Sequence, residues 1–267
     1  MGLRQRADNC GLACSAPPLP APHPARDSFR TMNLLAFDTS TDTLSIAVGR
    51  GDALWKHNGP GGAQASASLI PAIQRLLAQA ELDLGTLDAI VFGRGPGSFT
   101  GLRTACAVAQ GLAFGAGGGR GVPVLPVDTL AAVAETARLE HGCTQVLAVL
   151  DARMNEVYWA RYRWLDGAWQ GDSDFGLCAP EALPIEAGWT VAGNAQAAYG
   201  ERLAPHAPHV VALPTAAALL RLAPALLAAG GGQPAAQALP RYIRDKVAKT
   251  TAERAAERAA QSAPAHP

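Results

Sequence analysis

A glycine-rich stretch, GRGPGSFTG at residues 93–101, is the part of this 267-residue sequence whose composition first suggests chemistry. Gly95 and Gly97 let the backbone adopt positive φ and approach a ligand closely. A helix is predicted from about Phe99, and its first N–H groups, together with the helix dipole, can hold a phosphate or carboxylate. Alternatively, Ser98 caps this helix and the loop only turns the chain. The composition leaves both uses open.

Asp38 is a second candidate, because it ends an apolar run and is followed by hydroxyl side chains in FDTST. A carboxylate at this position can hold Mg²⁺ through water, although Asp followed by Thr and Ser is also a common turn cap. If the two segments meet, Asp38, Thr39, Gly95, Gly97 and Ser98 form a candidate contact for a nucleotide or another anion. No cofactor is firmly indicated, and ATP or ADP with Mg²⁺ within a complex is the candidate.

Other catalytic patterns are missing from the sequence. The glycine-rich stretch is neither a Walker A loop nor a G-x-G-x-x-G fingerprint, and no G-x-S-x-G pentad occurs. His57 stands alone, and His206 and His209 lie in a proline-rich stretch that favours a solvated loop. Cys10 and Cys14 lack the further ligands that zinc requires. The sequence therefore predicts neither a metal site nor a catalytic residue in this chain alone.

Charge and cysteine content narrow the function classes. Lys and Arg number 22 and Asp and Glu also 22, so no net field draws the chain to nucleic acid or to a membrane surface. Five cysteines without framework spacing favour a reducing compartment. No apolar run reaches the ~18 residues of a membrane span. We therefore expect a cytoplasmic protein without membrane contact, which reaches any RNA locally or through a partner.

The elements that would position these residues follow from hydrophobic periodicity, which predicts an alternation of strands and helices. A strand hairpin surrounds Asp38 in LLAFDTSTDTLSIAV, and the pattern begins again in VLAVLDARMNEVYWARY around Asp151. In each copy the aspartate precedes an apolar residue of the second strand by six positions, Leu44 and Val157. We therefore predict a duplicated α/β fold of two lobes, each a mixed sheet with flanking helices, built by analogy like actin, Hsp70 and the sugar kinases.

Four blocks in the same order resemble the TsaB family, also called YeaZ. They are the two hairpins, the block GRGPGSFTGLRTACAVAQGLAFG and the terminal RYIRDKVAK. The resemblance covers about residues 32–249. It implies the actin and Hsp70 fold and a role in making threonylcarbamoyladenosine in tRNA. The family's catalytic relative, TsaD, carries an H-x-x-x-H pair on its first helix, whereas Gln64 and Ser68 occupy this helix here.

The resemblance implies a noncatalytic scaffold subunit that binds and organises TsaD beside a TsaE-type ATPase. It would contact tRNA through the complex and form a homodimer when alone. The alternative from another class is an independent kinase or ATP-dependent transferase that uses Asp38 and the loop Gly93–Gly97.

Two helices are the expected partner surface, at residues 64–80 and 99–114. Gly101, Ala105 and Ala109 recur every fourth residue, and small side chains at this spacing let another helix approach closely. The alternative is that this stripe packs on the helix's own sheet. The residues expected at the interface are Leu69, Ile73, Leu76, Gly101, Ala105, Ala109 and Leu112. Glutamate at position 109 is accordingly expected to block association and leave the monomer folded.

The ends of the chain differ in composition from its middle. We expect a disordered extension at residues 1–31, a first lobe with the partner helices at 32–140, a second lobe at 141–249, and a disordered or partly helical tail at 250–267. The charged segment from Arg241 to Lys246 has three readings: a solvated face, a latch that returns to the first lobe, or a contact to the partner or tRNA.

Overall fold

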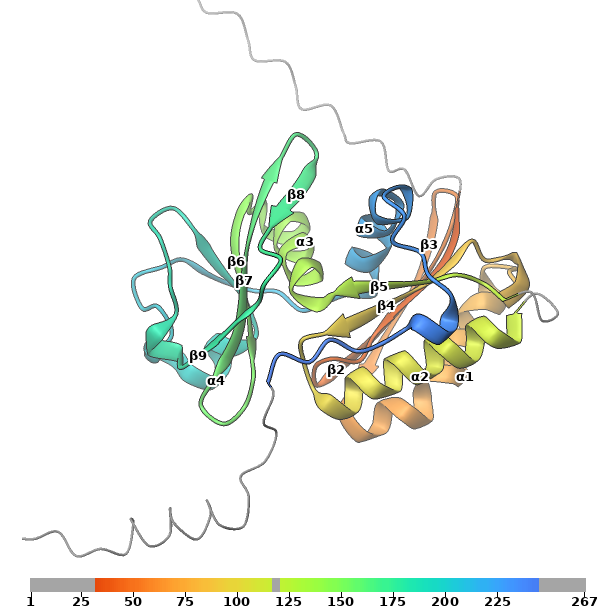
Figure 1. The fold of residues 1–267 in the computed structure, drawn as a ribbon, viewed down its shortest axis with the longest axis horizontal. Coiled ribbons are helices and arrows are strands. Elements are labelled where there is room, and N and C mark those ends of the chain that lie inside the picture. Colours follow the sequence, from red (N-terminus) through yellow and green to blue (C-terminus); the bar gives the residue numbers. More distant parts are fainter. Residues whose placement is uncertain (1–31, 117–120, 245–267) are drawn as a thin grey trace, which may run out of the picture.

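The computed structural model describes residues 32–116 and 121–244, so the N-terminal extension, the C-terminal tail, Asp245 and Lys246 lie outside the described residues. The described chain forms two β-sheets with helices packed on them (Figure 1). None of its helices is both long and apolar enough to cross a lipid bilayer.

The first sheet has five strands in the order β3-β2-β1-β4-β5. Strands β1 and β2 form the predicted antiparallel hairpin, β3 continues it antiparallel, and β4 and β5 are parallel to β1 and to each other. The strand bounds are β1 Asn33–Asp38, β2 Thr43–Arg50, β3 Ala53–Pro60, β4 Ala89–Gly95 and β5 Val124–Asp128.

The second sheet repeats this arrangement. Its order is β11-β10-β6-β7-β8, with β9 paired to β7, and β6 and β7 form the second hairpin. Strand β10 is parallel to β6 and to β11, as β4 is to β1 and to β5. The predicted fold, with two lobes that each contain a mixed sheet, is confirmed. The strand bounds are β6 Gln145–Asp151, β7 Val157–Leu165, β8 Ala168–Gly171, β9 Gly176–Cys178, β10 Thr190–Gly193 and β11 His209–Val211.

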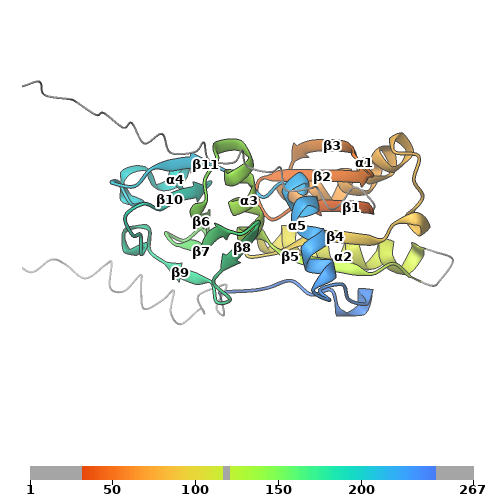
Figure 2. The ribbon, with the colours of Figure 1, turned by 90° about the horizontal axis from the view of Figure 1, so that it is seen from above.

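Helices cover both faces of the first sheet, because side chains alternate between the two faces of a strand. Leu35 and Phe37 of β1 pack toward the helices α1 and α2, whereas Leu34 and Ala36 pack toward α5. Figure 2 shows α5 crossing the sheet on the face opposite α1 and α2. The helix bounds are α1 Ala65–Gln79, α2 Phe99–Gly115, α3 Thr129–His141, α4 Ala195–Tyr199 and α5 Ala216–Ala228.

Two helices pack on the sheet of the other lobe, and not on the sheet whose strand precedes them in the sequence. Helix α3 follows β5 of the first sheet but packs its apolar residues, among them Leu130 and Val133, on the second sheet. Helix α5 follows β11 of the second sheet but packs on β1 of the first sheet, where Leu219 and Leu220 are buried. The packing of α3 and α5 therefore crosses the expected lobe boundary between residues 140 and 141.

Candidate functional site at the cleft between the lobes

The glycine-rich loop is seated directly on the turn that follows β1. A Cβ atom on Gly97 would stand 2.6 Å from the carbonyl oxygen of Ser40, and one on Gly101 would stand 1.8 Å from that of Thr39. Two hydrogen bonds join the same segments, because Ser98 N–H donates to Ser40 O at 2.7 Å and Thr39 Oγ1 donates to Gly101 O at 2.7 Å. This close approach accounts for glycine at 97 and 101 without a ligand.

Gly95 ties the same loop to two further segments. The Gly95 N–H donates to Thr129 Oγ1 at 3.1 Å, and Pro96 has no N–H to offer. A Cβ on Gly95 would stand 2.7 Å from the carbonyl oxygen of Arg241, which explains the absence of a side chain there. Ser98 does not cap α2 with its side chain within the described chain. The loop thus joins three segments of the protein, which neither sequence alternative had foreseen.

Asp38 lies at the end of β1, and its side chain is completely buried beneath the turn and the glycine-rich loop. Its Oδ1 accepts from Ser40 N–H at 2.9 Å and from Ser40 Oγ at 2.7 Å. Its Oδ2 faces Gly93, where a Cβ would stand only 1.8 Å away, and has no hydrogen-bond partner among the described residues. Burial raises the pKa of Asp38 to about 6, against the lowering effect of the two Ser40 hydrogen bonds. A sealed carboxyl of raised pKa is poorly suited to hold Mg²⁺ through water.

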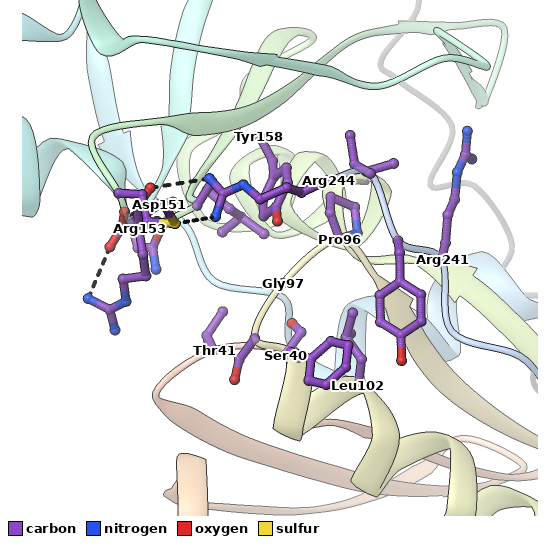
Figure 3. A pocket seen from close by; sticks show the side chains of 18 of the residues that line it. Ser40, Thr41, Pro96, Gly97, Leu102, Asp151, Arg153, Tyr158, Arg241 and Arg244 are labelled. Atoms are coloured by element: carbon purple, nitrogen blue, oxygen red, sulfur yellow. Dashed lines mark hydrogen bonds and ion pairs between the residues drawn. The ribbon is translucent and has the colours of Figure 1, made fainter. Parts of the chain in front are cut away.

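A cavity of about 320 Å³ opens between the two lobes, beside the turn and the loop (Figure 3). Of the five residues expected at a nucleotide or anion contact, Gly97 and Ser98 line this cavity. Asp38, Thr39 and Gly95 are not among the lining residues. The expected set is therefore divided between the cavity wall and the buried turn behind it.

The far wall of the cavity comes from the second lobe. Asp151 lies there at the end of β6, in the position that Asp38 occupies in the first lobe. Its Oδ1 accepts from Tyr199 Oη at 2.7 Å and its Oδ2 pairs with Arg153 at 3.1 Å. Arg153 also reaches Asp42 of the first lobe at 3.0 Å. The matching offsets of Asp38 and Asp151 predicted that the hairpin is repeated, whereas no sequence pattern predicted the contacts of Arg153.

The terminal segment closes the cleft and connects the lobes. Arg241 N–H donates to Arg94 O at 2.7 Å, and its guanidinium lies 3.5 Å from Asp128, at the end of β5. The same guanidinium stacks 3.9 Å from the centre of the Phe175 ring and donates to Ser173 O in the second lobe. For the described part of the segment, the structure shows the contacts that the latch reading expected.

Arg244 completes this latch. It pairs with Glu156 and lies 3.4 Å from Met154 Sδ, both in the turn between β6 and β7. Sequence reasoning missed both partners, because the contacts join residues about 90 positions apart. We define the strap as residues 235–244, the segment that begins in a short helix Ala235–Gln237 and ends at this ion pair.

Substituting Arg241 with alanine is expected to lower the free energy of unfolding by about 1–3 kcal/mol. The change removes an ion pair, a cation–π contact and a hydrogen bond from a largely covered side chain. Urea denaturation measures the loss. Arg75→Ala, at an exposed position of α1, is the control and should change the value by less than about 0.5 kcal/mol. Equal effects of the two substitutions would show that the latch adds no stability.

The residues expected to contact a partner are mostly buried inside this chain. Leu69, Ile73, Leu76, Ala105 and Ala109 belong to the core between α1, α2 and the first sheet, each at most 3% exposed. Gly101 is covered by the β1 turn, and Leu112 is partly exposed at the edge of the same core. The stripe thus packs on its own sheet, the second of the two sequence alternatives. Glutamate at 109 would place a charge in this core and unfold the monomer, contrary to the expectation.

The described residues contain no group of three histidine, cysteine, aspartate or glutamate side chains that could hold a metal ion. Gln64 is exposed at the start of α1, and Ser68 Oγ donates to its carbonyl oxygen at 3.1 Å. His209 is the first residue of β11 instead of lying in a loop, and its Nε2 lies 3.0 Å from Ala204 O.

Comparisons with known proteins point to the same tRNA modification, threonylcarbamoyladenosine. The family model of TsaD, tRNA N6-adenosine threonylcarbamoyltransferase, matches residues 60–174. The tRNA threonylcarbamoyladenosine biosynthesis protein TsaB of Escherichia coli K12 is 34% identical over 228 residues, which are 81% of this chain and 96% of that protein. The TsaB of Haemophilus influenzae is 42% identical over 132 residues, 49% of this chain and 54% of that protein.

A solved structure, YeaZ from Pseudomonas aeruginosa, covers 79% of this chain and 100% of its own, with 39% identity and a TM-score of 0.73. The two lobes with their repeated hairpins therefore define an α/β protein of the actin and Hsp70 class. The likeness extends along almost the whole length of the Escherichia coli relative. The chain belongs to the TsaB family of tRNA threonylcarbamoyladenosine biosynthesis proteins.

Proposed function

We propose that this chain is a noncatalytic scaffold subunit of the cytoplasm, which binds a TsaD-type transferase and organises it during threonylcarbamoyl transfer to tRNA. Membership in the TsaB family supports the pathway. The match of the TsaD model to residues 60–174 supports the partner, because related subunits present related surfaces. In the same proposal a TsaE-type ATPase joins the complex, tRNA is reached through it, and a homodimer forms when TsaD is absent.

The observation that best supports this proposal is that the outward face of α2 exposes small residues. Ala107, Gly111 and Gly115 are exposed there, on the side opposite the buried stripe. A Cβ atom on Gly111 or Gly115 would meet no described atom within 4 Å, so nothing described inside the monomer requires glycine. Glycine within a helix costs about 1 kcal/mol relative to alanine. A track of small residues with no internal role fits a second helix that packs closely against α2.

Exposed apolar side chains stand beside this track. Ile70 projects from α1, and Phe114 projects from the last turn of α2. Helix α1 packs along α2 (Figure 1), and both helices expose apolar side chains. We define the helix face as the exposed residues of α1 and α2 from Ser66 to Gly115. It replaces the buried residues first expected at the interface.

Substituting Ala107 with glutamate is expected to raise the Kd for a TsaD-type subunit at least ten-fold, because a charge would be placed against a closely packed helix. The monomer should keep its stability, since the side chain is exposed. Isothermal titration with the purified TsaD-type subunit from the same source measures the Kd. Ala225→Glu is the matched control, an exposed alanine of α5 on the opposite face of the first sheet, and should leave the Kd unchanged.

Two results would contradict the proposal. Unchanged affinity in Ala107→Glu would exclude the helix face. Steady turnover of ATP with Mg²⁺ by the purified chain, without any partner, would favour an independent enzyme over a scaffold.

A further inference from the structure

The strap runs beside α2 on the side away from α1. Cys106 Sγ and Gln110 Nε2 each donate to Ala238 O at 2.9 Å, and Arg103 Nε donates to Tyr242 Oη at 3.2 Å. Residues 103, 106 and 110 lie on one side of a helix with 3.6 residues per turn, about a quarter turn from Ala107. Figures 1 and 2 both show α1 and the strap on opposite sides of α2. The helix face is therefore bordered by the strap.

The strap is fixed at the backbone but exposes large apolar side chains. Its backbone is held at Ala238 and, through the Arg94 carbonyl, at Arg241. Between these points Leu239 is 65% exposed, and Tyr242, the residue after Arg241, is 46% exposed. Both side chains stand beside α2 on a segment that is already in place before any partner arrives.

An aromatic cluster continues this exposed surface to the start of α2. The rings of Phe99 and Tyr242 lie 5.2 Å apart, and Phe99 is 38% exposed. Arg103 stacks on Phe99 with its guanidinium carbon 3.7 Å from the ring centre, in addition to its hydrogen bond to Tyr242. The cluster is thus pre-organised, so little rotamer entropy is lost when it is covered.

We propose that the strap is the second half of the TsaD-binding surface, with Leu239 and Tyr242 as its apolar anchors and with Phe99 of α2 packed against Tyr242. This inference rests on the proposed function and adds to it a segment outside the two helices. The partner surface that fits it has an apolar hollow that takes the Tyr242 ring and the Leu239 side chain, next to a helix that lies along α2.

The composition of the helix face supports this extension. Its central track on α2 is alanine and glycine, which permit close approach but bury little side-chain area. Stable interfaces bury roughly 800 Å² on each partner, and their binding energy concentrates in a few large side chains, tyrosine and arginine among them. The strap supplies such side chains at the edge of the track. The helices and the strap together provide both features of a stable interface.

The test uses the full chain with Leu239→Ala and Tyr242→Ala, each titrated with the TsaD-type subunit. Each substitution is expected to raise the Kd at least ten-fold, as truncation of an interface anchor does. Val211→Ser is the matched control, a 71% exposed apolar residue on β11 of the second lobe, and should change the Kd less than two-fold. Circular dichroism melts of all three variants confirm that they are folded, and Tyr242→Phe separates the ring from its hydroxyl.

The outcomes distinguish this inference from the proposed function. If Ala107→Glu weakens binding but both strap variants bind within two-fold of the native chain, the strap is not part of the surface and the scaffold proposal stands. If the native chain itself does not bind the TsaD-type subunit, the proposed function fails and this inference fails with it. Weakening by both the helix and the strap variants supports the extended surface.

Discussion

Replacing Gly101 with alanine is expected to lower the free energy of unfolding by about 4 kcal/mol or more. The added Cβ would stand 1.8 Å from the carbonyl oxygen of Thr39, a distance that forces the β1 turn and α2 apart. The separation would also break the hydrogen bond from Thr39 Oγ1 to Gly101 O. Alanine normally favours a helix, so the sign of the effect here depends entirely on this contact.

Gly111→Ala is the matched control, because it makes the same change in the same helix. Its Cβ meets no described atom within 4 Å, so the variant should be more stable by about 0.5–1 kcal/mol. Urea denaturation of the chain alone at low protein concentration measures both values. Similar stabilisation of the two variants would contradict the close seating of α2 on the turn.

The second large effect expected is a pH dependence of stability that arises from Asp38. Its pKa is raised by burial from an ordinary value of 3.8 to about 6, so the folded chain holds this proton more tightly than the unfolded chain. The resulting stabilisation is complete below about pH 4 and is lost as the pH rises through 6. A pKa difference of this size corresponds to about 3 kcal/mol.

Asp38→Asn removes the titration and keeps an oxygen for the two Ser40 hydrogen bonds. The free energy of unfolding of this variant, relative to that of the native chain, should therefore rise by about 2–3 kcal/mol between pH 4 and pH 7.5. Asp174→Asn, at an exposed position, should show no such rise. Parallel pH profiles of Asp38→Asn and the native chain would show that Asp38 is not sealed in solution.

Much of the fold could be predicted from the sequence, because local patterns determine it. The repeated offset from Asp38 to Leu44 and from Asp151 to Val157 predicted the duplicated hairpins, which the sheet orders confirm. The apolar spacing of residues 99–114 predicted α2 to within one residue. Hydrophobic periodicity shows that a segment has a buried face. It does not show which neighbour covers that face, so the crossing of α3 and α5 between sheets was not foreseen.

The candidate site was predicted less well for the same reason. Glycine at 97 and 101 fits a ligand or a neighbouring backbone equally, and only the distance to Ser40 and Thr39 decides between them. The stripe of Ala105 and Ala109 likewise fits a partner or the chain's own sheet. Tyr242 and Phe99 lie more than 140 positions apart, and no local pattern predicts that they meet.

The exchange of α3 and α5 bears on how the two halves of this molecule depend on each other. Each half of the sequence supplies a helix that shields a sheet made by the other half. In a fragment that ends near His141, Leu34 and Val91 of the first sheet would be exposed, because α5 covers them in the full chain. The last helix of that fragment, α3, would have lost the second sheet on which it packs. Neither half of the sequence therefore holds the complete set of contacts that an independent domain needs.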